Sequence, residues 1–180
     1  MSFLETERLL LRPPELRDVA AIATWIGDFE VAKNLASVPH PYREDDARAH
    51  VAKAIEARAM GEGFAFSILR RQDEMFLGQC GLRLKEGSWR LGYWLGKPFW
   101  GQGYATEAAG RVLRYAFEVL KADRVGAGWF HDNPASGRVL EKLGFCYEGA
   151  APHLSQARGH DVYCHQVTLT EAEFRRKKAA

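Results

Sequence analysis

The 180-residue sequence lacks the features that mark secreted, membrane-spanning and metal-rich proteins. It holds three cysteines, an odd number with no Cys-x-x-Cys pair, so the pattern indicates neither a disulfide framework nor a zinc cluster. No stretch approaches the roughly 20 apolar residues that cross a bilayer, and no basic segment followed by an apolar core opens the chain. These absences favour a cytoplasmic protein with reduced thiols and no membrane partner.

Charge of one sign is also scarce. The formal net charge is +2, and the basic residues are dispersed apart from the tail Arg175-Arg176-Lys177-Lys178, which is typical of a solvated chain end. The six histidines show no metal-ligand spacing on a helix. We therefore expect no nucleic-acid partner and no metal.

Apolar residues, by contrast, are plentiful enough for one core. The hydrophobic content of 47% predicts a single domain over residues 1–180, with its core at about 6–170. Apolar periodicity predicts helices at 15–27, 44–59, 104–120 and 134–143, and strands at 8–12, 64–69, 76–84, 89–95, 124–130, 145–149 and 162–169. Residues 64–95 read as an antiparallel meander and residues 36–42 as a loop. The expected fold class is therefore α/β, a mixed sheet of six or seven strands with about four helices.

Two glycines, Gly101 and Gly103, stand between an expected strand and the start of an amphipathic helix. Without Cβ atoms, the backbone N–H groups of such a loop can converge on an anion, and the positive end of the helix dipole adds to the attraction. The alternative is a turn that only precedes a helix, and Gly-x-Gly alone does not decide between the two. The chain has no Gly-x-x-x-x-Gly-Lys-Ser/Thr, and Thr106 stands where a dinucleotide fingerprint has its third glycine. If the loop binds an anion, the sequence therefore predicts one of pyrophosphate size, bound by a loop that is neither a P-loop nor a dinucleotide fingerprint.

A second helix start carries polar groups at Asn133 and Ser136. Asn133 followed by Pro134 fits an N-cap with proline in the first helical position, and Gly144 fits the residue just past the helix end. Capping alone would explain Asn133. The hydroxyl of Ser136 lies in the first turn, where it either bonds backbone or lies beside an anion held at the helix terminus.

Together these segments resemble the GNAT superfamily of acetyl-CoA-dependent N-acetyltransferases. Four motifs in order carry the resemblance: Thr6-Glu7-Arg8-Leu9-Leu10-Leu11-Arg12-Pro13, then Gly92-Tyr93-Trp94-Leu95 with Gly101-Gln102-Gly103-Tyr104-Ala105-Thr106-Glu107-Ala108, then Asn133-x-x-Ser136 through Leu143-Gly144-Phe145, and Asp161-Val162-Tyr163. The chain is most similar to the branch that acetylates N-terminal residues of ribosomal proteins and various small amines. The resemblance implies the α+β fold of this superfamily, with a mostly antiparallel sheet whose central strands splay apart.

The resemblance also implies acetyl-CoA as cosubstrate, bound where the strands at 89–95 and 124–130 separate. Strand backbone would hold the pantetheine arm, and the N–H groups of the glycine loop would cradle the pyrophosphate. The residues assigned to cosubstrate binding in this way are Tyr93, Trp94, Leu95, Gly101, Gln102, Gly103, Tyr104, Ala105, Thr106, Asn133 and Ser136. A neutral primary amine would attack the thioester directly in a ternary complex, with no metal and no covalent enzyme intermediate.

Three positions depart from the superfamily pattern. Pro98 replaces a glutamine or arginine of the loop. Leu140 stands where many relatives have a general-acid tyrosine, so the resemblance implies Ser136 as the acid, with Asn133 as a second catalytic candidate. Arg90 stands where many have a glutamate base, and it either attracts an acidic acceptor or faces solvent. Because an α-amine with a pKa of about 8 is already partly neutral, no base is assigned.

The resemblance implies that the acceptor contacts residues 25–42 and a late loop at 151–159. The aromatic and basic side chains of these segments suit a peptide end or an aromatic or acidic amine. The expected partners are therefore a protein N-terminus, such as that of a ribosomal protein, or a small-molecule amine, and the expected assembly is a monomer or a homodimer. Two alternatives stay open: a catalytically silent acyl-CoA sensor or interaction module of the same fold, and a nucleotide-binding protein.

Two further side chains have ordinary structural explanations. Glu107 is placed for an i,i+4 ion pair with Arg111 on the expected helix. Cys146 is expected as a small, half-buried strand residue rather than a nucleophile.

Overall fold

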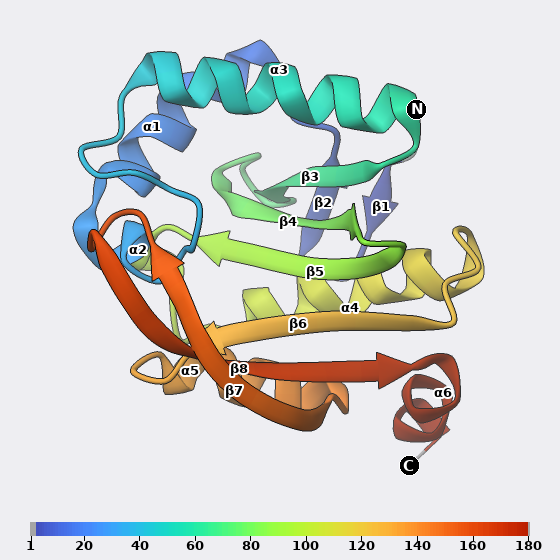
Figure 1. Ribbon diagram of the computed structural model, residues 1–180. Coiled ribbons are helices and arrows are strands. Elements are labelled where there is room, and N and C mark those ends of the chain that lie inside the picture. The colour runs from blue at the N-terminus through green and yellow to red at the C-terminus, as the bar shows by residue number, and fades with distance from the viewer. Residues whose placement is uncertain (1–2, 180) are drawn as a thin grey trace.

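The computed structural model describes residues 3–179, with side chains through residue 177, so the ends of the predicted 1–180 domain lie outside the described residues. Figure 1 shows a twisted sheet with helices on both of its faces. Eight strands lie in the order β1-β2-β3-β4-β5-β6-β8-β7. Their bounds are β1 Leu4–Glu5, β2 Leu9–Arg12, β3 Gly63–Arg70, β4 Phe76–Lys85, β5 Ser88–Leu95, β6 Arg124–Phe130, β7 Cys146–Ser155 and β8 His160–Thr170. All neighbouring strands are antiparallel except β5 and β6.

The helices form two layers, with α1 and α3 on one face of the sheet and α4 and α5 on the other (Figure 1). Their bounds are α1 Val19–Gly27, α2 Phe29–Ala32, α3 Glu44–Met60, α4 Tyr104–Glu118, α5 Pro134–Leu143 and α6 Glu171–Ala179, with 3₁₀ turns at Leu16–Asp18 and Lys97–Phe99. Each layer covers its own buried apolar cluster. The predicted apolar stripe of α4 lies on the sheet, where Val112 and Leu113 are fully buried.

The predicted fold class is confirmed, and the predicted elements agree with the structure to within two residues at most ends. The predicted counts are too low, since residues 3–179 contain eight strands and six α-helices. The missed β1 and α2 have two and four residues, which is too short for a periodic pattern. The missed α6 is mostly polar, and Phe174 is the side chain that it buries in the core.

The predicted late loop at 151–159 is wrong over most of its length. Strand β7 continues to Ser155, and a tight turn then leads into β8. The sequence suggested an earlier end because Gly149 and Pro152 interrupt the pattern. A register shift between Tyr147 and Gly149 accommodates the glycine. Pro152 is tolerated because β7 lies at the edge of the sheet, where a missing N–H leaves no neighbouring strand unpaired.

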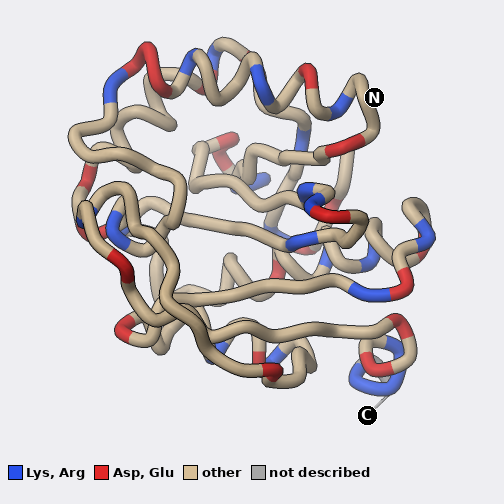
Figure 2. Tube along the Cα trace, in the orientation of Figure 1, with Lys and Arg blue, Asp and Glu red and all other residues tan. Residues whose placement is uncertain are grey.

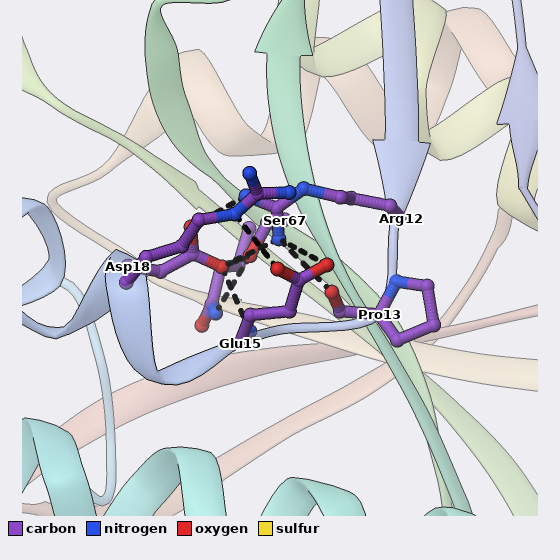
Figure 3. Close-up of polar contacts among 7 residues, drawn as sticks. Arg12, Pro13, Glu15, Asp18 and Ser67 are labelled. Atoms are coloured by element: carbon purple, nitrogen blue, oxygen red, sulfur yellow. Dashed lines mark hydrogen bonds and ion pairs between the residues drawn. The ribbon is translucent and has the colours of Figure 1, made fainter.

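A buried polar network ties the start of α1 to the sheet (Figure 3). The guanidinium of Arg12 donates to both carboxylate oxygens of Asp18, at 2.9 and 2.7 Å, and Ser67 Oγ donates to the same carboxylate at 2.8 Å. Arg12 and Asp18 are only 5% and 4% exposed, so the two charges depend on each other. Burial alone would raise the pKa of Asp18, but the hydrogen bonds from Arg12, the Glu15 N–H and Ser67 outweigh it and hold the pKa below its ordinary value.

Charged residues of both signs are spread over the molecule (Figure 2). Helix α3 begins with three acidic residues, Glu44 to Asp46, and carries both signs further along, and basic residues gather on α6 beside the C-terminus. No helix in the described part of the chain has both the length and the apolar character of a membrane span.

Candidate active site

The site begins where two neighbouring strands separate. Strands β5 and β6 pair in parallel through two residue pairs, Trp89 with Val125 and Arg90 with Gly126, and then diverge. The half-buried Arg90 stands at this fork and donates to Gln166 Oε1 of β8 at 2.6 Å. A Cβ at Gly126 would lie 2.7 Å from the Arg90 guanidinium, so glycine makes room for the side chain. The expectation that Arg90 faces solvent is therefore wrong, because the side chain bridges strands instead.

Where β5 and β6 have separated, toward the carboxyl end of β5, lies a cavity of about 430 Å³. It is lined by residues of these two strands and of the helices α4 and α5. All of the predicted cosubstrate residues except Gln102 line it: Tyr93, Trp94, Leu95, Gly101, Gly103, Tyr104, Ala105, Thr106, Asn133 and Ser136. The structure thus brings the strand, the glycine loop and the second helix start to one place. The amide of Gln102 turns away and donates to the carbonyl of Pro98 at 2.9 Å.

The glycine loop has the backbone conformation that its sequence predicts. Gly101 and Gly103 have φ of +74° and +81°, in the left-handed region that glycine adopts without strain. Gly103 is the N-cap of α4. Its carbonyl oxygen accepts the first hydrogen bond of the helix, from Glu107 N at 3.1 Å. The N–H groups of Tyr104, Ala105 and Thr106 therefore have no acceptor within the helix. All three residues line the cavity, so this helix start suits an anion.

An ion pair outside the cavity fixes this loop. The Glu107 carboxylate accepts from Arg8 Nε at 2.7 Å and from Thr6 Oγ1 at 2.6 Å, while Arg8 Nη1 donates to Gln102 O at 3.1 Å. The predicted Glu107–Arg111 pair is wrong, because Arg111 donates to the carbonyl of Glu5 instead. Burial would raise the pKa of Glu107, but the hydrogen bonds from Thr6 and Arg8 lower it. The glycine loop is thus held from the connection between β1 and β2.

The second helix start places two hydroxyls against each other. Asn133 caps α5, its Oδ1 accepting from Ser136 N at 3.3 Å, with Pro134 in the first helical position as predicted. Ser136 Oγ lies 2.8 Å from the hydroxyl of Tyr93, which reaches across from β5. Sequence reasoning assigned Tyr93 a backbone role alone. A tyrosine on the strand that borders the expected cleft could have suggested a hydroxyl in the site. Its contact with Ser136 could not be predicted, because it depends on how far β5 and β6 separate.

Leu140 is 1% exposed and packs in the apolar core. The position at which many relatives have an acid tyrosine is therefore a core position here. Within the described residues, no group of three or more His, Cys, Asp or Glu side chains is arranged to hold a metal ion. Cys146 is exposed rather than half-buried as expected, and its Sγ lies 3.3 Å from Glu173 Oε1, away from the cavity. That hydrogen bond to a carboxylate raises the pKa of the thiol.

The opposite end of the cavity is formed by the segment after α2. Val31, Asn34, Leu35 and Ala36 line it, whereas the other predicted acceptor residues of 25–42, among them Phe29 and Tyr42, do not. The turn between β7 and β8 is fastened to this segment. Arg158 Nε donates to Lys33 O at 2.9 Å, and Gln156 N donates to Ala36 O at 3.0 Å.

Arg158 is itself fixed by a bidentate pair with Asp132, with distances of 2.7 and 3.1 Å. The hydrogen bonds from Arg158 lower the pKa of Asp132. The β7–β8 turn, the end of β6 and the segment after α2 thus form one wall. The charged side chains that line the cavity are Arg138 and Lys142, both on α5, and no carboxylate of the described residues lines it.

The sequence and the structure are both similar to those of known acetyltransferases. A family model described as an acetyltransferase (GNAT) domain matches residues 8–146. The sequence is 29% identical over 177 residues to p20, an uncharacterized N-acetyltransferase of Bacillus licheniformis, covering 97% of this chain and 99% of that protein. It is 25% identical over 158 residues to the ribosomal protein uS5 alanine N-acetyltransferase of Escherichia coli (strain K12), covering 82% and 80%. The crystal structure of a GNAT-family acetyltransferase from Bacillus anthracis matches with a TM-score of 0.82 at 26% identity, covering 96% of this chain and 100% of that one.

Proposed function

Because the chain belongs to the GNAT family of acetyltransferases, whose members use acetyl-CoA, we propose that it transfers the acetyl group of acetyl-CoA to a primary amine. As an acyltransferase it acts as one N-acetyltransferase domain over residues 1–180. The observation that carries the proposal is the single cavity that joins the glycine loop, the diverging strand β5 and the Tyr93–Ser136 pair. A catalytically silent acyl-CoA sensor remains the alternative.

The residues present fit two parts of acetyl-CoA, its pyrophosphate and its pantetheine arm. The free N–H groups of Tyr104, Ala105 and Thr106 suit the pyrophosphate, and the backbone of β5 below Arg90 is free of a strand partner on the β6 side, which suits the amide-bearing pantetheine arm. Lys142 and Arg138 add positive charge on α5. Together these groups support binding of the cosubstrate along the strand, with its thioester near Ser136.

The reaction proceeds by direct attack of a neutral amine in a ternary complex. The protein positions both reactants, and a backbone N–H of the diverging strand stabilises the oxyanion. Ser136 donates a proton to the departing sulfur, since no other hydroxyl acid is available where Leu140 stands. No carboxylate base is assigned, so the amine nitrogen loses its proton to water.

The lining of the acceptor end favours an α-amine with uncharged surroundings. The residues that line this end of the cavity, Val31, Asn34, Leu35 and Ala36, include no carboxylate to stabilise a protonated amine. At neutral pH the neutral fraction of an α-amine with a pKa of about 8 exceeds that of a lysine amine by about 200-fold. We therefore assign as acceptor the N-terminal residue of a protein, a ribosomal protein included, or a small amine of similar pKa. Polyamines and lysine side chains are less suitable acceptors, because their amines are mostly protonated at neutral pH.

Titration of acetyl-CoA against ATP and NAD tests the ligand, and release of CoA thiol with a panel of amines tests the reaction. We expect acetyl-CoA to bind while ATP and NAD do not, and peptides beginning with Ala or Ser to release CoA at least about tenfold faster than spermidine or a peptide with a blocked N-terminus and one lysine. Acetyl-CoA binding without release from any acceptor would favour the sensor. Equal affinity for ATP or NAD would contradict the proposal.

Replacing Ser136 with alanine tests the acid. Turnover is expected to fall about 100-fold, while the Kd for acetyl-CoA changes less than about twofold, because the hydroxyl acts when the C–S bond breaks rather than in binding. The matched control is Ser88→Ala, which removes an exposed hydroxyl at the far end of β5. Unchanged turnover in Ser136→Ala would remove this residue from the mechanism.

A further inference from the structure

The Tyr93 phenol and the Ser136 hydroxyl meet across the gap between β5 and α5. The Tyr93 hydroxyl lies 2.8 Å from Ser136 Oγ and 3.1 Å from the carbonyl oxygen of the same residue. Both residues line the cavity. Asn133 holds the Ser136 backbone from the other side. Ser136 is therefore fixed through its N–H, its carbonyl and its hydroxyl, although it lies in the first turn of a helix.

Two proton arrangements satisfy this geometry. In the first, the Tyr93 O–H donates to the carbonyl of Ser136 and the Ser136 O–H donates to the phenol oxygen. In the second, the Tyr93 O–H donates to Ser136 Oγ, which leaves the serine proton free to point elsewhere in the cavity. Rotation of two hydroxyls interconverts them, and the second keeps Oγ hydrogen-bonded while its proton is given away.

On the basis of the proposed acetyl transfer, we infer that Tyr93 is the positioning residue that aims the Ser136 proton at the departing sulfur and supports Ser136 Oγ as the proton leaves. In that step the nitrogen–carbon bond forms and the carbon–sulfur bond breaks, with the electron pair passing to sulfur. Sulfur takes the Ser136 proton, and the proton that the amine nitrogen gives up returns to Ser136 Oγ through water. The net products are the amide and CoA thiol.

Ser136 takes the acid role that the buried Leu140 cannot supply, and Tyr93 supports that serine from the strand side. Burial raises the pKa of Tyr93, although its bond to Ser136 opposes the shift, so the phenol stays protonated and able to donate under ordinary conditions. Its donor role is thus retained throughout the range in which α-amines become neutral.

A double-mutant cycle tests the inference. We measure kcat and KM for the wild type, Tyr93→Phe, Ser136→Ala and the double variant with the best acceptor. Tyr93→Phe is expected to lower kcat about tenfold, the worth of one hydrogen bond, with the KM for acetyl-CoA changed less than about twofold. In the Ser136→Ala background the same change is expected to alter kcat less than about twofold, because Tyr93 acts through the serine. Tyr147→Phe, which removes an exposed phenol of β7, is the control.

Equal losses in both backgrounds, an unchanged kcat in Tyr93→Phe, or a loss confined to acetyl-CoA affinity would overturn the inference while leaving the proposed function standing. A wild type that releases no CoA would overturn both. Should Tyr93→Phe fold poorly, a fluorinated tyrosine of lower phenol pKa at position 93 keeps the side-chain volume. Its kcat is then expected to fall at alkaline pH relative to the wild type as the phenol ionises and stops donating, and a parallel pH profile would contradict the inference.

Discussion

Valine in place of Gly103 is expected to abolish measurable acetyl-CoA binding, a loss of at least about 100-fold in affinity, while the chain stays folded. Gly103 has φ of +81°, which a β-branched residue adopts only with strain, and its Cβ would lie 3.4 Å from Arg8 Nη2. The new side chain would therefore press on the arginine that holds the loop and turn the N–H groups of α4 away from the pyrophosphate. Calorimetric titration with acetyl-CoA measures the loss.

The matched control for this variant is Gly87→Val in the β4–β5 turn. Gly87 has φ of +76° and nothing within 4 Å of its Cβ position, so it carries the same backbone strain far from the cavity. Both variants should lose a similar stability of about 1–3 kcal/mol, and Gly87→Val alone should bind acetyl-CoA as the wild type does. Normal binding by a folded Gly103→Val would show that the loop is not the phosphate site.

Alanine in place of Asp18 is expected to cost about 3–5 kcal/mol in the free energy of unfolding, because it leaves the Arg12 guanidinium buried and uncompensated. Against a total of about 5–15 kcal/mol for a typical domain, this is the largest stability loss that we expect from a single polar side chain. Urea unfolding with an unchanged m value measures it. The exposed i,i+4 pair of Glu171 and Arg175 is the control, since Arg175→Ala should leave the free energy of unfolding nearly unchanged. Equal losses in the two variants would contradict the role given to the buried network.

The same pair predicts a pH dependence. The pKa of Asp18 is lower in the folded chain than its ordinary value of 3.8, so its stabilising contribution is complete above that value and is lost as the pH falls through the folded pKa. The difference in unfolding free energy between the wild type and Asp18→Ala should therefore be greatest near neutral pH and shrink below pH 3.8. A difference that stays constant down to the acid transition would contradict the assignment.

Local sequence rules predicted the parts of the site that each depend on one element. Gly101 and Gly103 are needed for backbone conformation alone, and Asn133 with Pro134 specifies a helix start whatever lies beside it. The strands of the meander follow from alternation, so their ends agreed closely with the structure. These features could be read directly from residue order because no distant partner decides them.

Features that depend on distant partners could not be predicted in this way. The phenol of Tyr93 meets Ser136 because β5 and β6 diverge after two residue pairs and α5 begins beside the gap, which no local pattern encodes. Glu107 had an arginine one helical turn away, yet Arg8 reaches it from the N-terminal strands. Arg158 likewise contacts the segment after α2 across more than a hundred residues of sequence. In each case a long side chain contacts a residue that is distant in the sequence and lies near only in the folded chain.

The fork between β5 and β6 gives the molecule an internal edge strand. After Arg90, β5 has no strand partner on its β6 side, although the Leu95 carbonyl accepts from Trp100 Nε1 at 2.8 Å. Proteins usually shield such an edge because it invites another chain to pair. Here α4 and α5 border the edge, and the cavity along it is the place proposed for the pantetheine arm. In the proposed binding mode, acetyl-CoA would complete the sheet at the place where its two halves are least connected. Ligand binding is therefore thermodynamically linked to the cohesion of the whole fold, and the melting temperature should rise with cosubstrate concentration.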